Sequence, residues 1–550
     1  MTKTGKLELT WVGKNEIKRY EPRILVEDFG KSNITIDSQT SNMLIHGDNL
    51  LALRALEHDY AGKIKCIYID PPYNIATANP HYDDNLENSL WLNLMKPRLE
   101  LLWKLLSDDG LLAVQIDDEQ FARLFLLMDE ICTQKNMKSI CVKMSEPTGV
   151  KMASIKKAKS IPKLKEFIIL AKKDGVKNLN IEYIPKEKWD NEYKLLINGV
   201  NRDDLEVLKQ IMEGDDYSEE TIKLADSIAS KIKISSVNDI IKGVSKKEEI
   251  DSIKYENSWR IARDVAVTGN VKDLANQKRN MVNGESFIVV TPQKKKYLMK
   301  KDYNAESAQP RCKLLFADQY LTVHPGDLWT DIKTTGLDNE GIVDFPKSKK
   351  PEKLIRRIIQ MSTNKSDFVL DSFLGSGTTA AVAHKMGRKW IGIELGDHAY
   401  SHCKVRLDKV IEGEQSGISK IVNWKGGGGY RFYELAPSLL ERHEVLPVYQ
   451  INKEYSFEML CEAICKLEGF KYHPQGEIHG RSSESRFIHI ASDMVTGEYV
   501  KQITKELGEN DSVLIYGTKI QSNLRLPDNI EIKRIPNDLL KKFDFESEIK

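Results

Sequence analysis

The chain of 550 residues has room for about three or four domains, and its 41% hydrophobic content is ample for ordinary cores, which excludes a disordered protein. No apolar run approaches the roughly 20 residues of a membrane span, and the N-terminus lacks an apolar signal-peptide core, so we expect a cytoplasmic protein without membrane association. The 82 Lys and Arg balance 81 Asp and Glu, and the seven cysteines form no C-x-x-C pair, so no global basic field, disulfide framework or metal site is indicated.

After an N-terminal arm, residues 1–40, short apolar runs alternate with segments of helical periodicity. The segment "KIKCIYID" is almost continuously apolar, as in a parallel sheet that is covered on both faces. We expect strands at 42–48, 63–70, 111–116 and 165–173, and helices at 49–60, 89–110 and 119–131. This alternation predicts an α/β fold with a doubly wound, Rossmann-like sheet, whose first half we assign to residues 41–173.

A lysine-rich stretch and a change of pattern follow. From Thr133 to Lys173 there are eleven lysines against only Glu146 and Glu166. Such a run is either a solvated face or a nucleic-acid contact. The candidate DNA-binding residues within it are Lys151, Lys156, Lys157 and Lys159. The strand and helix alternation then dissolves into charged, mixed segments, and we expect residues 174–325 to form an inserted domain.

The α/β pattern resumes in residues 326–435, which we assign to the second half of the same sheet. We expect an amphipathic helix at 349–362, strands at 367–372 and 389–395, and a helix at 377–387 between them. The glycine run "GGGG" at 426–429 is interpreted as a hinge or tight loop. Residues 436–550 carry strands of their own, "SRFIHIA" and "DSVLIYG", which predict a separate small α/β domain.

The first chemical signal is a glycine-rich turn, "SFLGSGTT", between a strand and a helix. Gly375, Gly377 and Ala380 expose backbone N–H groups at a helix N-terminus, where a nucleotide-like ligand can approach closely. Glu394 ends the next strand, where an acid can accept both ribose hydroxyls of an adenosine ligand. By itself this pattern fits S-adenosylmethionine, a dinucleotide, or a purely structural turn.

The second signal is Asp70-Pro71-Pro72-Tyr73, which ends a buried strand abruptly, because neither proline can donate to a sheet ladder. If strands 63–70 and 367–372 are central neighbours, this turn lies beside the glycine-rich turn at the switch point of the sheet. Strand 42–48 then lies beyond strand 389–395, and Asp48 can reach the adenine end of the ligand.

Two acidic positions have a simpler interpretation as caps. Asp48 precedes a helix and is equally typical of an ordinary N-cap, and Asp117 and Asp118 follow a strand end as capping residues rather than catalytic ones.

With these motifs in place, the chain resembles the β-group amino DNA methyltransferases, in which the catalytic motif precedes the cofactor motif. It is most similar to the Mod subunits of type III restriction-modification systems. The segments that carry the resemblance are "LELTWVGK", "HGDNLLAL", "IYIDPPYN", "WLNLMKPRLELLWKLLSDDG", "QIDDEQ", "DLWTDI", "KKPEKLI", "LDSFLGSGTT" and "GGGGYRFYEL". The insertion matches only by position and corresponds to the family's target-recognition region. The segment "KKPEKLI" matches a cofactor-flanking helix, although a plain packing helix explains it equally well.

The resemblance implies a circularly permuted methyltransferase that transfers a methyl group from S-adenosylmethionine to adenine N6 in double-stranded DNA by base flipping. The implied catalytic residues are Asp70, Pro71, Pro72 and Tyr73: the Asp70 carboxylate and Pro71 carbonyl accept the amine hydrogens, and Tyr73 stacks on the flipped base. The implied cofactor-binding residues are His46, Asp48, Asp70, Asp371, Phe373, Gly375, Ser376, Gly377, Thr378 and Glu394. The implied assembly is a homodimer with a separate Res helicase/nuclease partner.

Other interpretations remain at this stage. No Pro-Cys pair exists, which excludes a cytosine-C5 methyltransferase, and "FGKSN" is no phosphate-binding loop because Leu25 stands where its first glycine belongs. A nicotinamide-dependent oxidoreductase would explain the glycine-rich turn but leaves "DPPY" without a role. A cytosine-N4 methyltransferase and a catalytically inactive DNA-specificity subunit are the remaining alternatives, and adenine is preferred by analogy alone.

Overall fold

The computed structural model divides into two compact units, one of residues 1–181 and 326–550 and the other of residues 182–325. The structure describes residues 8–16, 19–21, 23–74, 86–145, 159, 161–186, 188–332, 337–343, 345, 349–443, 445–505, 507–508 and 510–543. Within these ranges no helix combines the length and apolar composition needed to cross a membrane. The seven cysteines are free, and six of them are buried.

The first unit is built on a ten-stranded sheet. Its strands, in spatial order, are β1 (Leu25–Glu27), β18 (Arg431–Leu435), β2 (Met43–His46), β17 (Lys389–Glu394), β16 (Phe368–Asp371), β3 (Ile64–Ile69), β4 (Leu106–Ile116), β6 (Lys165–Lys172), β5 (Met137–Lys143) and β15 (Leu328–Trp329). The six strands from β18 to β4 are mutually parallel, and β1 and β6 join them antiparallel. The predicted parallel sheet is therefore present, with an antiparallel extension at either side.

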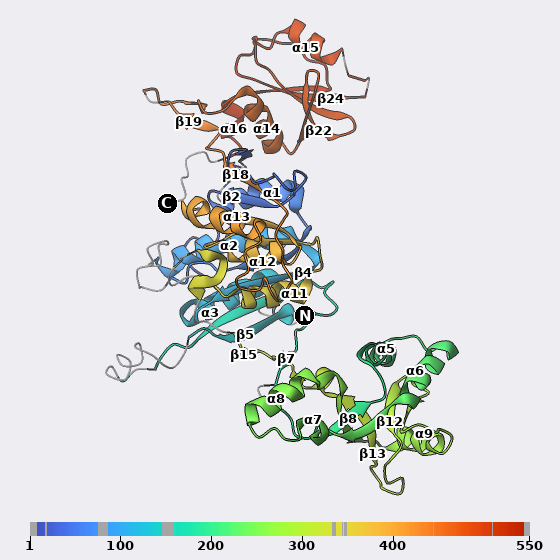
Figure 1. Cartoon of the computed structure of the whole chain (residues 1–550). Helices are drawn as coiled ribbons and strands as arrows, with labels where there is room; N and C mark the ends of the chain where they lie inside the picture. The colour runs from blue at the N-terminus through green and yellow to red at the C-terminus, as the bar shows by residue number, and fades with distance from the viewer. Residues whose placement is uncertain are drawn as a thin grey trace, which may run out of the picture. The chain divides into compact units, whose positions relative to one another are not determined.

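Helices cover both faces of this sheet (Figure 1). The side chains of Ile67 and Ile69 pack in one hydrophobic core and those of Cys66 and Tyr68 in another, because successive strand residues point to opposite faces. The first core includes residues of α1 (Asn49–Tyr60), α2 (Asn88–Leu105) and α3 (Asp118–Cys132), and the second includes residues of α11 (Glu352–Ser362), α12 (Thr378–Lys385) and α13 (Val405–Ile411). The sheet is thus the middle of three layers.

The winding of the sheet reverses between β16 and β3. The chain runs from β3 through α2 to β4 on one side, and from β16 through α12 to β17 on the other. Leu370 pairs with Ile67 across this junction, which confirms that the two strands are neighbours. Glu394 pairs with His46, which confirms that β2 lies beyond β17. The carboxyl ends of β3 and β16 therefore flank the switch point, where open α/β sheets bind ligands.

Two boundaries differ from the expected ones. The helix expected at 89–110 ends at Leu105, because Leu106 already pairs with Ile64 as the first residue of β4. The inserted unit begins at residue 182 and not at 174. The intervening segment stays attached to the first unit because Gly175 N–H donates to the Asp108 carbonyl (2.9 Å) and Asn180 N–H to the Met361 carbonyl (2.8 Å).

The second unit has its own antiparallel sheet, with helices packed on it (Figure 1). Its strands, in spatial order, are β11 (Ser286–Val290), β12 (Lys296–Lys300), β13 (Arg311–Phe316), β10 (Ile261–Ala266), β8 (Leu195–Asn198) and β9 (Lys233–Ser236). Its helices are α5 (Arg202–Glu213), α6 (Glu219–Lys231), α7 (Asn238–Ile241), α8 (Lys247–Glu256), α9 (Gly269–Arg279) and α10 (Ala317–Tyr320), and β7 (Ile184–Pro185) pairs with β14 (Thr322–Val323). Residues of α5 and α6 share a core with one face of the sheet.

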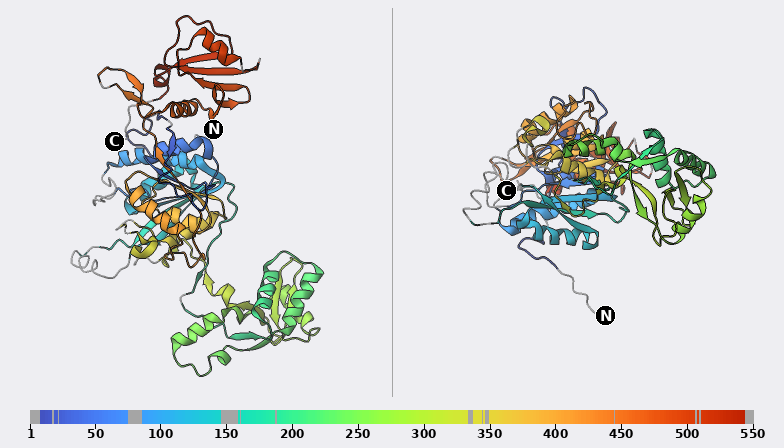
Figure 2. Two further views of the ribbon diagram at one scale, coloured as in Figure 1. Left: turned by 45° about the horizontal axis from the view of Figure 1, so that its top comes forward. Right: turned by 60° about the horizontal axis from the view of Figure 1, so that its bottom comes forward.

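The C-terminal segment carries a second small sheet (Figure 2). Its strands are β21 (Lys471–Gln475), β22 (Ile478–Ser483), β23 (Arg486–Ile490), β24 (Ser512–Gly517) and β25 (Ile530–Arg534), preceded by the hairpin β19 (Leu440–Arg442) and β20 (Tyr449–Ile451), with α14 (Phe457–Leu467), α15 (Gly497–Thr504) and α16 (Asn537–Leu540). Its core also takes in Ile24 from the N-terminal arm. The segment groups with the first unit, although a separate domain was expected.

Candidate active site

The turn that follows β3 is held from α2. Trp91 Nε1 donates to the Pro72 carbonyl at 2.9 Å, and Asn74, the residue after Tyr73, has φ +53°. Asp70 stands at the start of this turn, at the carboxyl end of β3. The two prolines end the ladder as expected, so the Asp70 side chain leaves the sheet at the switch point rather than continuing a strand.

Asp70 is part of a compact cluster of charged and hydroxyl groups. The Tyr73 hydroxyl lies 2.7 Å from both Asp70 Oδ1 and Glu166 Oε2. Lys350 Nζ lies 3.1 Å from Asp70 Oδ2, 2.7 Å from the Tyr73 hydroxyl and 3.3 Å from Glu166 Oε2. The Lys350 ammonium is also 4.8 Å from the centre of the Tyr73 ring. One cation thus meets both carboxylates and the aromatic face.

Side chains from β3 and β4 form hydrogen bonds that hold the cluster in place. Gln115 on β4 donates to Glu166 Oε2 at 2.6 Å, and the Tyr68 hydroxyl on β3 donates to Gln115 Oε1 at 2.7 Å. Gln115 and Tyr68 are fully buried, so these bonds have no competition from water. They orient Glu166, which in turn holds Lys350 close to Asp70.

Burial and the neighbouring charges act on each group of the cluster. Burial raises the pKa of Asp70, and Lys350 opposes that rise. Burial also acts to raise the pKa of Glu166, but Lys350, Gln115 and Tyr73 together hold it below its usual value. Burial acts to lower the pKa of Lys350, whereas Asp70 and Glu166 raise it above its usual value. Of the two carboxyls that pair with Lys350, Asp70 is therefore the one whose pKa lies above its usual value and Glu166 the one whose pKa lies below it.

Lys350 and Glu166 were not among the predicted site residues. Glu166 was one acid in a lysine-rich stretch, and Lys350 belonged to the segment interpreted as a flanking helix. The usable signal was a Lys-Pro pair directly before that helix. Glu352, two residues after Lys350, is fully buried and accepts from Arg406 (2.7 Å) and Lys385 (2.9 Å), which fixes the start of α11.

The glycine-rich turn contacts its predicted acid partner directly. Glu394 Oε2 accepts from Gly375 N–H at 2.6 Å, and Oε1 accepts from the N–H groups of Leu395 (2.8 Å) and Gly396 (3.1 Å). Gly375 and Gly377 have φ +57° and +79°, a region in which a side chain is strained, so glycine is favoured at both positions. Glu394 is 2% exposed, so its carboxylate is almost completely enclosed by the chain.

Asp371 lies between the two motifs. Its carboxyl accepts from the Phe373 N–H (2.9 Å) and the Thr379 hydroxyl (2.6 Å), and burial raises its pKa to about 7. The neighbouring Ser372 hydroxyl is buried without a hydrogen-bond partner among the described residues. A small cavity of about 40 Å³ joins the two turns, and its lining includes Asp70, Lys350, Asp371, Phe373, Gly375, Ser376 and Thr378.

His46 and Asp48 lie at the carboxyl end of β2 and have protein partners of their own. His46 Nδ1 lies 2.8 Å from Glu434 Oε2 and 2.6 Å from the Tyr400 hydroxyl. Asp48 accepts from Leu51 N–H (3.1 Å) as the N-cap of α1, and it pairs with Arg98 (3.0 Å). The capping role of Asp48 is therefore present, and its ligand contact stays a prediction.

The remaining predicted positions divide between caps and the lysine-rich stretch. Asp117 accepts from Glu119 N–H (3.0 Å) as the N-cap of α3, which confirms the capping interpretation. Lys151, Lys156 and Lys157 lie outside the described residues, and Lys159 is exposed.

Comparison with known proteins agrees with this arrangement. A family model described as DNA methylase, of the N6/N4 type, matches residues 64–404. The chain is 36% identical over 453 residues, 76% of its length, to a Haemophilus influenzae protein named "Probable type III restriction-modification enzyme HindVI Mod subunit", and 24% identical over 413 residues, 68% of its length, to the StyLTI Mod subunit of Salmonella typhimurium. It spans 58% and 55% of the lengths of these relatives.

Among solved structures, the PvuII DNA methyltransferase, described as cytosine-N4-specific, is 14% identical with a TM-score of 0.32, covering 72% of this chain and 95% of that one. The family match spans both halves of the parallel sheet, from β3 with its Asp70 turn to the glycine-rich turn and Glu394. The chain therefore belongs to the N6/N4 DNA methylase family.

Proposed function

We propose that the chain transfers a methyl group from S-adenosylmethionine to N6 of a flipped adenine in double-stranded DNA, as the modification subunit of a type III-like restriction-modification system. The observation that carries this proposal is the meeting of two motifs, the Asp70 turn and the glycine-rich turn, around one cavity at the switch point. Similarity to two Mod subunits supports the system type.

The cofactor site is assigned to the glycine-rich turn and the acids around it. The partnerless Ser372 hydroxyl and the N–H-rich loop around Gly375 suit a polar ligand, and Glu394 is positioned to exchange its Gly375 bond for a ribose hydroxyl. The other residues that we assign to the cofactor site are His46, Asp48, Asp371, Phe373, Ser376, Gly377 and Thr378. When bound, S-adenosylmethionine would supply the methyl group of its sulfonium, with the neutral thioether as the leaving group.

The Asp70 turn is assigned to the base. An exocyclic amine is a poor nucleophile because its lone pair is delocalised into the ring. The Asp70 carboxylate and the Pro71 carbonyl accept its two hydrogens and localise the lone pair, and Tyr73 stacks on the base, a contact worth about 1–3 kcal/mol. The nitrogen loses one proton on methylation, and Asp70 is the acceptor that we assign to it. Positioning of the reacting atoms is the main catalytic contribution.

Lys350 gives this site a charge that must be moved before the base arrives. Its ammonium forms an ion pair with the Asp70 carboxylate and lies over the Tyr73 ring. Glu166, 3.3 Å from the ammonium, is the counter-ion that retains Lys350 when Asp70 turns to the amine. An ammonium between the two carboxylates also keeps Asp70 ionised, which is the form that accepts a hydrogen bond from the amine.

The wider assembly belongs to the same proposal. We assign DNA recognition to the second unit with the lysine-rich stretch before it, and we expect a homodimer in the cytoplasm with a separate Res subunit for translocation and cleavage. The C-terminal segment is the candidate surface for dimer formation or Res docking. In such a dimer one protomer reads the DNA while the other methylates it.

The test is modification-sensitive sequencing of DNA from cells that express the chain, beside cells that express Asp70→Ala. We expect N6-methyladenine at one recurring motif in the first culture and none in the second. If the motif carries N4-methylcytosine, the substrate is cytosine and not adenine. Calorimetry with S-adenosylmethionine and NAD in parallel separates a methyltransferase from an oxidoreductase, and absence of both methylation and cofactor binding would leave an inactive specificity subunit.

A further inference from the structure

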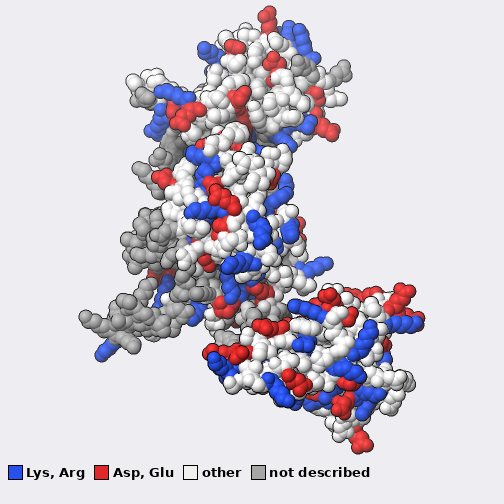
Figure 3. All heavy atoms as spheres, in the orientation of Figure 1, with Lys and Arg blue, Asp and Glu red and all other residues white. Residues whose placement is uncertain are grey.

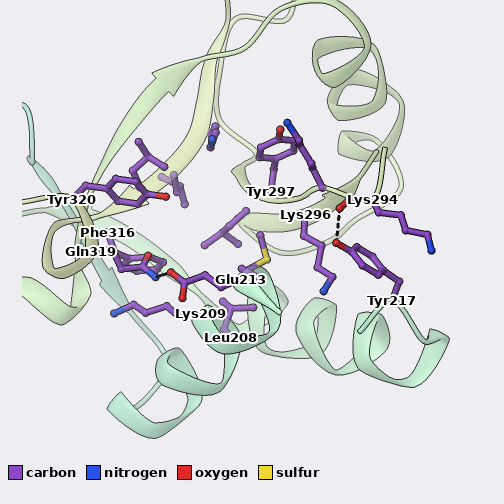
Figure 4. Close-up of a pocket in the computed structure, with 16 residues that line it drawn as sticks. Leu208, Lys209, Glu213, Tyr217, Lys294, Lys296, Tyr297, Phe316, Gln319 and Tyr320 are labelled. Carbon is purple, nitrogen blue, oxygen red and sulfur yellow. Dashed lines mark hydrogen bonds between the residues drawn. The ribbon is translucent and has the colours of Figure 1, made fainter. Parts of the chain in front are cut away.

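The second unit contains a basic, aromatic-lined groove of about 310 Å³ (Figure 4). It is bounded by α5, the turn between β11 and β12, the strands β12 and β13, and α10. Five lysines and three tyrosines line it, together with Glu213 as its single acidic residue. Charges of both signs are interspersed over the visible face of the molecule (Figure 3), so this groove is a local concentration of cations on a chain of nearly balanced charge.

Two of the five lysines hold the fold. Lys209 donates to the Trp259 carbonyl (2.9 Å) and pairs with Asp318 (2.5 Å). Lys296 donates to the carbonyls of Ile211 and Gly214 (2.8 Å each) and so satisfies the end of α5. The partners of these two ammonium groups are protein atoms, and neither lysine needs a ligand.

The other three lysines line the groove and have no carboxylate partner among the described residues. Lys313 lies 4.6 Å from the centre of the Tyr297 ring, and no described acidic residue pairs with it or with Lys294 or Lys295. Burial first, and then the charge of Lys295, lowers the pKa of Lys313. Two cations that repel each other in a partly buried site are stabilised by an anion between them.

The acid in the groove does not supply that anion. Glu213 accepts from Gln319 Nε2 at 2.7 Å, at the α5 and α10 side of the groove, and it pairs with no lysine among the described residues. The Tyr217 hydroxyl donates to the Lys294 carbonyl and so ties this tyrosine to the turn that carries Lys294 and Lys295 (Figure 4). The site is thus preformed, cationic and open, with apolar contacts for the carbon atoms of a ligand.

We propose that this groove binds the phosphodiester backbone of the DNA substrate, with Lys295 and Lys313 contacting phosphate and the tyrosine rings contacting the sugar. This inference rests on the proposed function and names the part of the second unit that holds the duplex. Lysine contacts to phosphate fix the register of a protein on DNA without reading its sequence. The groove therefore positions the duplex, and base reading belongs to other side chains.

The test compares the full-length wild-type chain with the double variant Lys295→Gln/Lys313→Gln. The matched control is Lys246→Gln/Lys247→Gln, two exposed lysines in and beside α8 that lie outside the groove. Fluorescence anisotropy measures affinity for two unmethylated duplexes, one with the motif that the chain methylates and one with that motif scrambled, at several salt concentrations. Lys295→Glu, at an exposed position, tests charge without touching the half-buried Lys313.

We expect the double variant to bind both duplexes about tenfold or more weakly, with a salt slope smaller by about 0.9 for each phosphate that the protein no longer neutralises. Lys295→Glu should weaken binding in the same direction, and the control should match wild type. Unchanged affinity and slope in the double variant would overturn the proposal, as would weaker binding that is confined to the motif duplex. If wild type neither binds nor methylates DNA, the proposed function itself fails, which is a separate result.

Discussion

Lys350 Nζ lies 3.1 Å from Asp70 Oδ2 and 4.8 Å from the centre of the Tyr73 ring, although 277 residues separate Lys350 from Tyr73. One ammonium group therefore contacts both side chains that we assign to the target base. The same contact that keeps Asp70 ionised must be released, toward Glu166, when the base arrives. This relationship predicts a pH-dependent role for Lys350.

Replacing Lys350 by Met should move the acidic limb of the rate to higher pH. Burial and the charge of Glu166 both raise the pKa of Asp70, and Lys350 is the cation that opposes them. Without Lys350, Asp70 stays protonated up to a higher pH. The acidic limb of the single-turnover methylation rate should therefore shift upward by about one pH unit, which corresponds to about 1.4 kcal/mol. Lys350→Arg keeps the charge and should restore the wild-type limb. A uniform loss of rate with an unmoved limb would contradict the electrostatic role.

Asp70→Ala should abolish methyl transfer while leaving the fold intact. Lys350 keeps Glu166 as a partner, so melting should stay within a few degrees of wild type, and binding of cofactor and DNA should be retained. We expect a loss of about 10²–10³-fold or more in turnover, as for other single transition-state contacts. Tyr73→Ala should fall between Asp70→Ala and wild type, because it weakens the flipped-base state. The measurement is single-turnover transfer from tritiated cofactor at saturating DNA, and near-normal turnover or outright unfolding of Asp70→Ala would make the turn structural.

Glu394 substitutions should act on cofactor affinity. Glu394→Ala removes the acceptor of Gly375 N–H and the proposed ribose contact together, so calorimetry should show S-adenosylmethionine binding weakened by about tenfold or more. Glu394→Gln retains one carbonyl acceptor and should be intermediate. Turnover at saturating cofactor should change much less than affinity. Equal affinity in all three proteins would remove Glu394 from the cofactor site.

Asp371→Asn should stabilise the ligand-free protein most at high pH. The pKa of Asp371 is raised to about 7 in the folded chain, chiefly by burial, against about 3.9 for an exposed Asp. Since the folded state binds the extra proton, the wild-type free energy of unfolding should fall as pH rises from about 4 to about 7 and stay low above that. The Asn variant lacks this pH-dependent fall. Thermal melting of both proteins at pH 5 and pH 8 measures it, and an equal difference at the two pH values would contradict it.

The proposed homodimer is tested by size-exclusion chromatography with light scattering at micromolar concentration. We expect twice the mass of the 62.8 kDa chain. A chain ending at residue 435 lacks the candidate interface and should be monomeric, although Ile24 then loses part of its core. A fully active monomeric wild type would remove the dimer from the proposal.

Much of the site was predictable because its parts are local in sequence. Pro71 and Pro72 cannot donate to a sheet ladder whatever surrounds them, and the glycines at 375 and 377 permit the positive φ that a tight turn needs. The apolar stripe of α11, with Leu354, Ile355, Ile358 and Ile359 all fully buried, follows from helical spacing alone. That β3 and β16 are neighbours is only a condition at the level of the sequence, and their parallel pairing confirms it and brings the two turns together at the switch point.

Element ends were less predictable, because pairing competes with local propensity. The Ser-Asp-Asp-Gly run at 107–110 signals the end of α2 a few residues too late, because the helix already ends at Leu105, where Leu106 pairs with Ile64. In the same way, residues 174–181 look like the start of an insertion, but backbone bonds to Asp108 and Met361 attach them to the first unit.

The sequence by itself determined the sheet, its two chemical turns and the type of chemistry that they suit, because those features depend on backbone constraints and periodicity. The tertiary structure alone decided what surrounds Asp70. The antiparallel pairing of β6 with β4 places Glu166 beside Asp70. The start of α11, which is held by the bond from Arg406 to Glu352, places Lys350 there. Glu166 contacts Tyr73 across 93 residues and Lys350 across 184 residues. These contacts depend on strand register and helix placement, so no local sequence pattern could predict them.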